Sequence, residues 1–326
     1  QAEVQVPMGL YGAIIVVPST APLTCASANT MSLAKAAYNH VGACYDREYL
    51  LQLGEIDIRL NNAVEAQVQA CPVAPCPLLS VSTEPYQPQY FLINGRSLPD
   101  DLDVPYSPGF AHQPYNANPH MYPGELMLIR LIGQGRYPHP FHIHGNHARV
   151  LAYDGNLITA KSDITKLAGP QLFTLTTTPG QSLDAVFTWT GQGLNWDVYG
   201  RDVPHTCNGV ALNTANPNNP AQQTAGFDPV TKEYCPDHGK AIPVTLPDPA
   251  IVASGEWYGG SPYLGLQAVN ATPLPPNAAQ QNPGAGYAFP WHSHHEREIT
   301  TNNVYPGGMM TLMIIDPPGT PIDETK

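Results

Sequence analysis

The sequence predicts an all-β protein, a Greek-key β-sandwich or barrel with long loop insertions. The chain of 326 residues contains 36 Pro and 28 Gly, and only 12% of its residues are charged, which favours short strands joined by turns over helices. Hydrophobic residues make up 42% of the chain and 17 residues are tyrosine, so a packed core is expected rather than disorder. Apolar segments of strand length also recur between turn residues along the sequence.

The first ninety residues are expected to hold two strands and a short helix. A Gly-containing turn precedes the apolar run 11–17, which predicts a buried strand. The small residues of Thr30–His40 predict a short helix, and Arg47–Leu60 predicts a strand because it alternates near its end. Residues 61–88 contain several prolines and two cysteines and therefore predict a loop.

The centre of the chain predicts further strands. Gln89–Asp100 should be a strand ending in a turn at Asn94 and Gly95, and a Pro- and Tyr-rich loop fills 101–123. Another strand is expected at Gly124–Gly133, and the histidine-rich stretch that follows it continues as a strand.

The C-terminal half predicts strands around one long insertion. Gln171–Gly191 should form two strands around a Pro-Gly turn, and Phe289–Ile299 and Gly307–Pro317 should close the fold. Residues 192–285 are rich in Asn, Pro, Gly and Gln and predict little regular structure. Since so long a loop is unusual in a compact domain, we expect it to be functional or a contact surface.

Charge and cysteines indicate the compartment and exclude some partners. A formal net charge of −12 disfavours nucleic acid and anionic membranes as partners, and no apolar run approaches the length of a membrane span. The even number of cysteines favours disulfides in a secreted, periplasmic or cell-surface protein, with free thiols as the alternative. Their spacing suggests three local couples, and none is a C-x-x-C motif of zinc or haem attachment. The candidate couples are Cys25 with Cys44, Cys71 with Cys76, and Cys207 with Cys235.

Two H-x-H pairs are the strongest functional signal. His142 and His144 lie two residues apart, as do His292 and His294, so each pair projects from one face of a strand. If the two strands are neighbours, four neutral imidazoles converge, which suits copper best and then zinc or iron. A single H-x-H pair can also be a hydrogen-bonded core pair or a surface accident, but two pairs in apolar surroundings favour a metal site.

The other histidines are given supporting roles. His147 is expected to pack beside the first pair, and His295 to form hydrogen bonds from the opposite face of its strand; both, with His139, are possible additional ligands or neighbours of the metal. The remaining histidines lie in predicted loops and are interpreted as solvated or structural: His40, His112, His120, His205 and His238.

The motif H-P-F-H-I-H-G at 139–145 resembles the H-P-x-H-x-H-G signature of multicopper oxidases, laccase-like proteins of cupredoxin fold. W-H-S-H-H followed by G-G-M-M resembles the C-terminal H-C-H segment of that family. The strand sequences after Arg47 and Tyr90 are also similar, and the resemblance spans most of 4–191 and 289–317. The 192–285 insertion has no recognised counterpart.

The resemblance implies a cupredoxin-like fold and a type 2/type 3 copper cluster. By position, His142 would be a type 2 ligand, and His144, His292 and His294 would be type 3 ligands. His139 would face a mononuclear blue copper. The family's bridging cysteine is Ser293 here, however, and its second blue-copper histidine falls on Glu298.

These departures predict no type 1 blue copper in this chain, because a serine hydroxyl replaces the soft thiolate ligand. Met309 and Met310 also come later than the family's axial methionine. His139, without its partners, is expected to be structural.

The resemblance also implies a domain organisation. A trinuclear cluster needs eight histidines from two domains, and four candidates are present here. Residues 1–18 are expected to be the last strand of a preceding cupredoxin domain or an intersubunit strand, and residues 19–44 a linker. Residues 45–326 would form the cupredoxin-like domain, with its insertion at about 192–285.

The chain is expected to contribute half of a type 2/type 3 copper cluster to an exported oxidoreductase. That enzyme would reduce dioxygen while oxidising phenols or metal ions. The missing ligands would come from an N-terminal cupredoxin domain or another subunit, which favours an oligomer. The alternative is a catalytically inactive cupredoxin-fold protein that binds metal or serves assembly in an oligomer or fibre. Copper-dependent nitrite reduction is disfavoured because it also needs a blue-copper cysteine.

Overall fold

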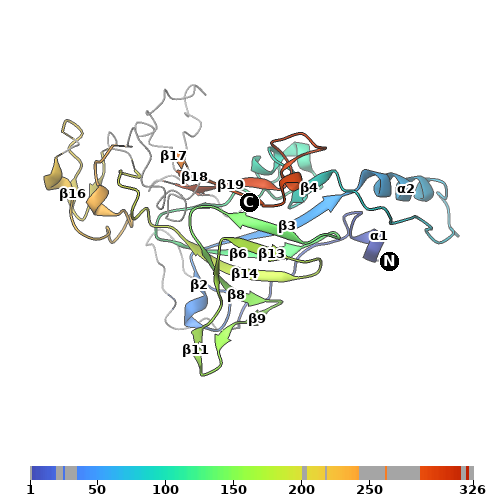
Figure 1. Ribbon diagram of the computed structural model, residues 1–326, viewed down its shortest axis with the longest axis horizontal. Coiled ribbons are helices and arrows are strands. Elements are labelled where there is room, and N and C mark those ends of the chain that lie inside the picture. The colour runs from blue at the N-terminus through green and yellow to red at the C-terminus, as the bar shows by residue number, and fades with distance from the viewer. Residues whose placement is uncertain are drawn as a thin grey trace.

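Two β-sheets packed face to face form the centre of the molecule (Figure 1). This computed structural model describes residues 2–19, 25, 35–199, 204–216, 219–241, 261–262, 287–316 and 321–322. The larger sheet has the strand order β12-β8-β14-β6-β3-β4, with β9 on β8, and the smaller has the order β13-β7-β18-β19-β5, with β17 on β18. The all-β prediction is confirmed.

The strands of the larger sheet cover most of the predicted apolar segments. They are β3 (Arg47–Ile56), β4 (Tyr90–Ile93), β6 (Leu126–Gly133), β8 (Ala148–Tyr153), β9 (Asn156–Leu157), β12 (Gln171–Leu172) and β14 (Ser182–Thr188). The parallel pair β3–β6 and the antiparallel pair β6–β14 form the middle of this sheet.

The smaller sheet carries both histidine pairs. It consists of β5 (His120–Met121), β7 (His139–Ile143), β13 (Thr174–Thr177), β17 (Ser261–Pro262), β18 (Tyr287–Ser293) and β19 (Met310–Ile315). The three strands β7, β18 and β19 pair antiparallel in that order.

Shorter elements lie around the sandwich. The helices are α1 (Ala2–Gln5) and α2 (Ile58–Gln69), with single 3₁₀ turns η1 (Val41–Ala43), η2 (Asp100–Leu102), η3 (Pro108–Phe110), η4 (Pro220–Gln222), η5 (Cys235–Asp237) and η7 (Glu296–Ile299). The hairpins are β1 (Lys35–Ala36) with β2 (Cys44–Tyr45), β10 (Thr159–Ala160) with β11 (Asp163–Leu167), and β15 (Thr206–Cys207) with β16 (Val210–Ala211). None of the described helices is long and apolar enough to cross a membrane.

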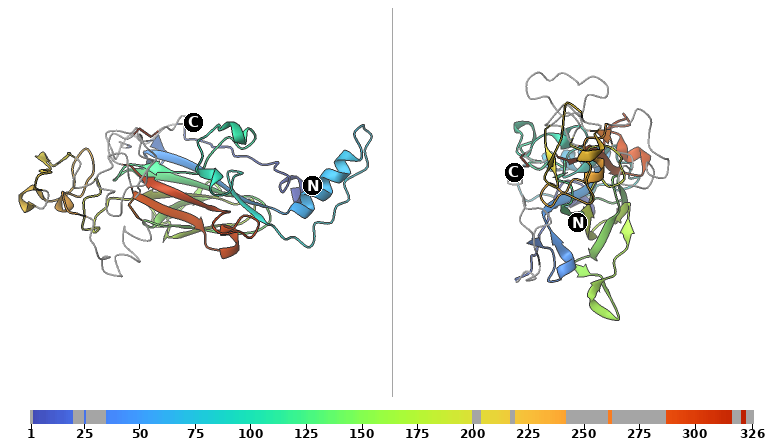
Figure 2. Two further views of the ribbon diagram at one scale, coloured as in Figure 1. Left: turned by 90° about the horizontal axis from the view of Figure 1, so that it is seen from above. Right: turned by 90° about the vertical axis from the view of Figure 1, so that its left-hand side faces the viewer.

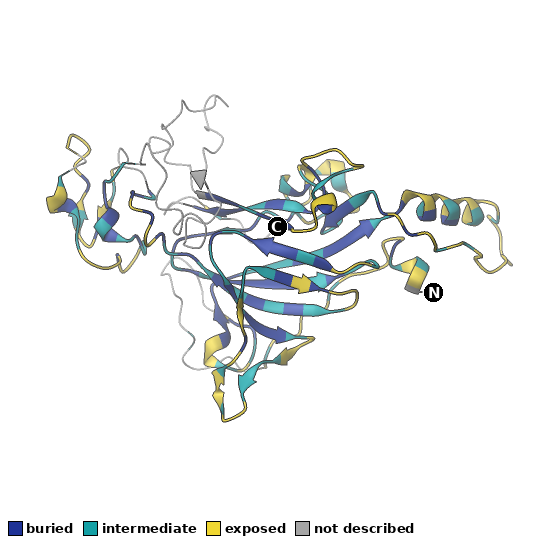
Figure 3. Ribbon diagram, viewed as in Figure 1, coloured by how far each residue is buried: buried dark blue, intermediate teal, exposed yellow. Residues whose placement is uncertain are grey.

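The core lies between the two sheets, where the strands are buried (Figure 3). Strand β14 alternates buried and half-buried residues, so that Leu183, Ala185 and Phe187 face inward. The ring of Phe187 packs against the ring of Trp291, from the other sheet, in a T-shaped contact with ring centroids 5.4 Å apart. Trp291 is fully buried and immediately precedes His292, so core packing fixes the strand that carries the second histidine pair.

Several predicted elements are confirmed and others are wrong. The turn at Asn94 and Gly95 is present, with φ of 52° and 82°, values typical of a two-residue hairpin turn. The two strands around the Pro-Gly turn and the closing strands are also present. The single strand expected through the histidine stretch is two strands, because Gly145 at φ 105° ends β7 before the chain returns in β8.

The loop predicted at residues 61–88 is wrong in its first part, which is helix α2. Asp57 ends the strand and caps the helix, since its Oδ1 accepts hydrogen bonds from the backbone N–H groups of Arg59 and Leu60. Leu60 and Val64, one helical turn apart, are buried together in a small cluster with Tyr86. The strand predicted to Leu60 therefore ends at Ile56.

The N-terminal prediction of a buried strand at residues 11–17 is wrong for this chain by itself. This segment forms no strand, and Ile14 and Val16 are 93% and 82% exposed. Pairing of this segment with another chain stays a prediction. The described part of the predicted helix Thr30–His40 contains strand β1 instead, and residues 30–34 lie outside the described residues.

The insertion and helix α2 lie at opposite ends of the sandwich (Figure 2). In the insertion, the described residues 192–199, 204–216 and 219–241 contain short strands and 3₁₀ turns, in line with the prediction of little regular structure. Residues 242–260 and 263–285 lie outside the described residues. All three expected disulfides are present, joining Cys25 to Cys44, Cys71 to Cys76 and Cys207 to Cys235.

The cap of helix α2 gives a stability prediction. Asp57→Ala removes both cap hydrogen bonds and the bond that Oδ2 accepts from the N–H of Gln87 at 2.8 Å. We expect the free energy of unfolding in urea to fall by about 1–2 kcal/mol. Glu65→Ala on the exposed face of the same helix is the control and should stay within about 0.5 kcal/mol of the wild type. Equal effects of the two changes would contradict the assigned cap.

Candidate metal centre

The pairing of β7 with β18 brings the two H-x-H pairs together. In this antiparallel register His142 lies directly opposite His292. The backbone N–H of His294 donates to the carbonyl of Pro140 at 2.8 Å, which continues the contact beyond the last strand residue. Ring centroids are 5.0 Å apart for His142 and His144, 5.0 Å for His142 and His294, and 5.2 Å for His144 and His292. The four predicted ligands thus form one cluster, called the histidine cluster below.

Hydrogen bonds orient the imidazoles of the histidine cluster. Nδ1 of His292 lies 2.8 Å from the carbonyl oxygen of Ser293, and because a carbonyl only accepts, this nitrogen carries the proton. The lone pair of the neutral ring is then on Nε2, which lies 3.2 Å from Nε2 of His144. Nδ1 of His142 lies 2.8 Å from Oγ1 of Thr174 on β13. Such outer contacts hold metal-binding histidines in one orientation.

Burial favours the neutral form of His142 and His292. His142 is 6% exposed, His144 and His292 are half-buried, and His294 is exposed at the rim. Burial, and then the three neighbouring imidazoles, lower the pKa of His142 to about 4. Burial also lowers the pKa of His292. Neutral imidazole is the form that binds a metal, so the donor set fits copper chemically.

The histidine cluster does not by itself enclose one ion. Within the described part of the chain, the group of potential ligands whose donor atoms all lie within 4.8 Å of one another is Asp197, His205, Glu233 and His238, in the insertion. The donor atoms of the histidine cluster are not all this close to one another. Two of them, Nε2 of His144 and Nε2 of His292, are 3.2 Å apart and are spaced as ligands of one ion. It therefore offers part of a metal's coordination shell.

His139 takes part in a buried network of carboxylates instead. Its Nε2 lies 2.9 Å from Oε2 of Glu55, and its Nδ1 lies 3.0 Å from Oε2 of Glu298. Ser293 donates its hydroxyl to the same Glu298 oxygen. Burial alone would lower the pKa of His139, but the hydrogen bonds and charges of the two carboxylates outweigh it and raise the pKa to about 9.

This network occupies the place where the family resemblance puts the blue copper. Ser293 and Glu298 stand at the positions of the family's cysteine and second histidine, and here they bond to each other. Both ring nitrogens of His139 contact carboxylates, so neither has a lone pair directed at a metal. The arrangement supports the prediction that His139 is structural.

The remaining predicted histidines have different surroundings. His147 stacks on Phe173 with ring centroids 3.6 Å apart, which fits a packing role. His295 is exposed, and its backbone N–H donates to Oγ of Ser293 at 3.2 Å. His40 caps a 3₁₀ turn and His120 pairs with Asp316, whereas His112 is exposed. His238 is fully buried, so the solvated interpretation does not hold for it.

Two contributors to the site were not foreseen from the sequence. Glu55 is only 4% exposed although it lies in the apolar strand β3, and it accepts hydrogen bonds from Tyr86 and from the backbone N–H of Arg136 as well. The sequence signal for Glu55 is a carboxylate within a strand whose other residues are mostly buried, because such a group needs a buried partner. Thr174 gave no signal, because its role depends on the pairing of β13 with β7.

Part of the chain is similar to known multicopper oxidases. Residues 82–194 match the family model described as multicopper oxidase. The blue copper oxidase from Nitrosomonas europaea is 13% identical, covering 82% of this chain and 43% of that chain with a TM-score of 0.34. The multicopper oxidase mgLAC is 13% identical, covering 86% and 46% with a TM-score of 0.35. The laccase from Botrytis aclada is 18% identical, covering 45% and 23% with a TM-score of 0.25.

This chain spans less than half the length of these solved structures, and no curated protein matches it. The two packed sheets form a β-sandwich, as predicted. The family match then confirms the resemblance to multicopper oxidases: the chain contains a multicopper oxidase-like domain. The matched residues include His142 and His144, whereas His292 and His294 lie beyond them.

The network around His139 predicts a pH dependence of stability. Because the folded-state pKa of about 9 exceeds the ordinary value of 6.5, the charged ring stabilises the fold fully below that ordinary value. This stabilisation is lost as the pH rises through about 9. The expected loss in the free energy of unfolding between mildly acidic and alkaline pH is about 3 kcal/mol.

Urea unfolding at a series of pH values measures this dependence in the wild type and in His139→Gln. The variant should decline less at alkaline pH than the wild type, whereas the control His112→Gln, in an exposed loop, should keep the wild-type decline. A residual decline is expected in all three proteins, because Asp197 and Glu233 raise the pKa of His205 to about 10. The same decline in His139→Gln as in the wild type would show that another group is responsible.

Proposed function

We propose that this chain contributes half of a type 2/type 3 copper cluster to an exported multicopper oxidase-like oxidoreductase. The enzyme would reduce dioxygen to water while oxidising a small one-electron donor, a phenol or a metal ion such as Mn, Fe or Cu. The observation that carries the proposal is the register of β7 against β18, which joins both H-x-H pairs in a domain that resembles multicopper oxidases.

His142, His144, His292 and His294 are the residues proposed to hold copper. Bound copper would supply the one-electron chemistry that passes electrons from the donor to dioxygen. The chain's own contribution is to position the imidazoles. The carbonyl of Ser293 sets the tautomer of His292, and the indole N–H of Trp291 donates to the carbonyl of His144 at 3.0 Å.

Electrons would have to enter the cluster from outside this domain. The position of the family's thiolate is a serine bonded to Glu298, and a hydroxyl in that network is neither a soft copper ligand nor an electron path. We therefore propose that a blue copper elsewhere accepts electrons from the donor.

The other four histidines of the cluster would come from a second cupredoxin domain, in the same polypeptide or in another subunit. The partial coordination shell of the histidine cluster supports this, because each ion needs further ligands. The three disulfides support export to an oxidising compartment, as a secreted, periplasmic or cell-surface protein.

A second candidate is a cupredoxin-fold protein that binds metal or assembles without catalysis. The observation that favours it is the exposed apolar segment at residues 10–17, where Leu10, Ile14 and Val17 are 68%, 93% and 61% exposed. Such a segment suits contact with another subunit. Copper content and oxygen uptake with a phenol or Mn(II) separate the candidates: bound copper without oxygen uptake favours assembly.

Ligand variants test the proposed copper site. His144→Ala and His294→Ala should each lower the copper bound per chain without unfolding the domain, because His144 is half-buried and His294 exposed. Copper is counted by mass spectrometry of the metal after dialysis, and folding is followed by circular dichroism. His112→Ala is the matched control and should keep the wild-type copper content. Unchanged copper in both ligand variants would refute the assignment.

A further inference from the structure

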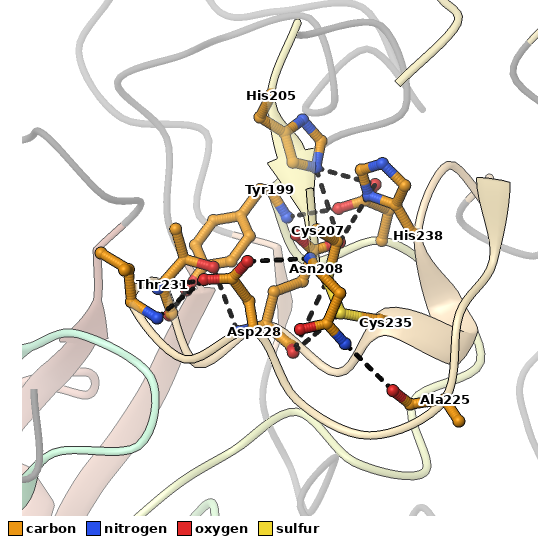
Figure 4. The surroundings of a disulfide bond; sticks show 12 residues. Tyr199, His205, Cys207, Asn208, Ala225, Asp228, Thr231, Cys235 and His238 are labelled. Atoms are coloured by element: carbon orange, nitrogen blue, oxygen red, sulfur yellow. Dashed lines mark hydrogen bonds and ion pairs between the residues drawn. A yellow bond between two sulfur atoms is a disulfide. The ribbon is translucent and has the colours of Figure 1, made fainter. Parts of the chain in front are cut away.

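A second cluster of metal-ligating side chains lies in the insertion, away from both H-x-H pairs in sequence. Asp197, His205, Glu233 and His238 each offer one donor atom, and these atoms all lie within 4.8 Å of one another. Figure 4 shows the two histidines of this group side by side near the disulfide of Cys207 and Cys235. No short motif marks this group, since its members are spread over residues 197–238.

The donor atoms are spaced as the corners of one coordination shell. Nε2 of His205 lies 3.2 Å from Oδ2 of Asp197 and 3.6 Å from Oε1 of Glu233. Nδ1 of His238 lies 2.8 Å from the same Glu233 oxygen and 3.8 Å from the same Asp197 oxygen. In a tetrahedral zinc site with bonds of about 2.0 Å, the ligand atoms are separated by about 3.3 Å. These four distances, from 2.8 to 3.8 Å, bracket that value.

The cluster is buried, and within the part of the chain that the structure describes no lysine or arginine forms an ion pair with its two carboxylates. The side chains of Asp197 and His238 are 0% exposed and that of Glu233 is 2% exposed, while His205 at 17% faces the rim. Lys240 is close, but its Nζ donates to Asp237 and Asn195 instead. Two buried carboxylates are costly unless a cation or protonated partners compensate them.

A buried carboxylate oxygen without a partner also supports a missing ion. Oε2 of Glu233 is buried and has no hydrogen-bond partner among the described residues. Buried polar atoms without partners are rare, and an absent ion is one of their ordinary causes.

The surrounding backbone holds the ligands in place. Asp197 accepts hydrogen bonds from the N–H of Tyr199 at 2.9 Å and from the N–H of Gly239 at 2.6 Å. The disulfide between Cys207 and Cys235 ties the segment of His205 to the segment that carries Glu233 and His238 (Figure 4). Outer hydrogen bonds of this kind are what a metal-binding carboxylate needs.

We propose that Asp197, His205, Glu233 and His238 bind one zinc ion that fixes the fold of the insertion. Two imidazoles and two carboxylates form a borderline-hard donor set, and four protein ligands in tetrahedral spacing leave no open position, as in structural zinc sites. A zinc charge of +2 balances the two carboxylates with both imidazoles neutral. This site is independent of the copper function proposed above.

The test uses the whole chain in a His144→Ala/His294→Ala background, so that zinc cannot be counted at the histidine cluster. After equilibration with Zn²⁺ and dialysis, this protein should hold one zinc per chain. X-ray absorption at the zinc edge should show four nitrogen or oxygen ligands at about 2.0 Å and no sulfur.

Loss of a residue that only hydrogen-bonds to a metal ligand weakens metal binding by roughly 10- to 100-fold. Adding His205→Ala removes a ligand itself and should therefore weaken zinc binding by more than this. This ligand is the most exposed of the four, so its removal leaves the least buried space. Asp197→Asn keeps the side-chain shape and should also lose zinc, and His112→Ala should not. Chelation should lower the melting temperature of the parent but not of His205→Ala. Absence of zinc from the parent, or equal zinc in parent, His205→Ala and Asp197→Asn, would overturn the proposal.

Discussion

The antiparallel pairing of β7 with β18 is the constraint on which the candidate centre depends. It places His142 opposite His292, and the period of two along each strand then brings His144 and His294 to the same side. Trp291 immediately precedes His292 and faces the core against Phe187, so packing holds the register. A slip of one residue would bury the imidazoles and expose the tryptophan. The same core contacts that stabilise the sandwich therefore position the proposed ligands.

Burial explains the environment of His139. A buried histidine must satisfy both ring nitrogens, and Glu55 and Glu298 do so here. Ser293 completes the network by donating to Glu298. The carboxylates hold the ring of His139 in its charged form. His142 shows the reverse, because burial and the neighbouring imidazoles keep its ring neutral. Two histidines of one strand are thus given opposite charge states by their surroundings.

The sequence predicted what depends on local pattern. The H-x-H spacing, the turn at Asn94 and the three cysteine couples could be found because each is set by neighbours along the chain. Helix α2 is harder to predict, because the prolines and cysteines that follow it favour a loop. The local signal for the helix is the N-cap residue Asp57. The cluster of Asp197, His205, Glu233 and His238 could not be predicted, since its ligands meet only through the folded path of the insertion.

Copper-edge X-ray absorption of the copper-loaded chain tests the central claim most directly, that four imidazoles and no thiolate hold copper in this domain. The account predicts a first shell of imidazole nitrogens without sulfur. That shell should be lost when His142, His144, His292 and His294 are all replaced by alanine. A sulfur ligand to copper, or the same nitrogen shell in the fourfold variant, would contradict it.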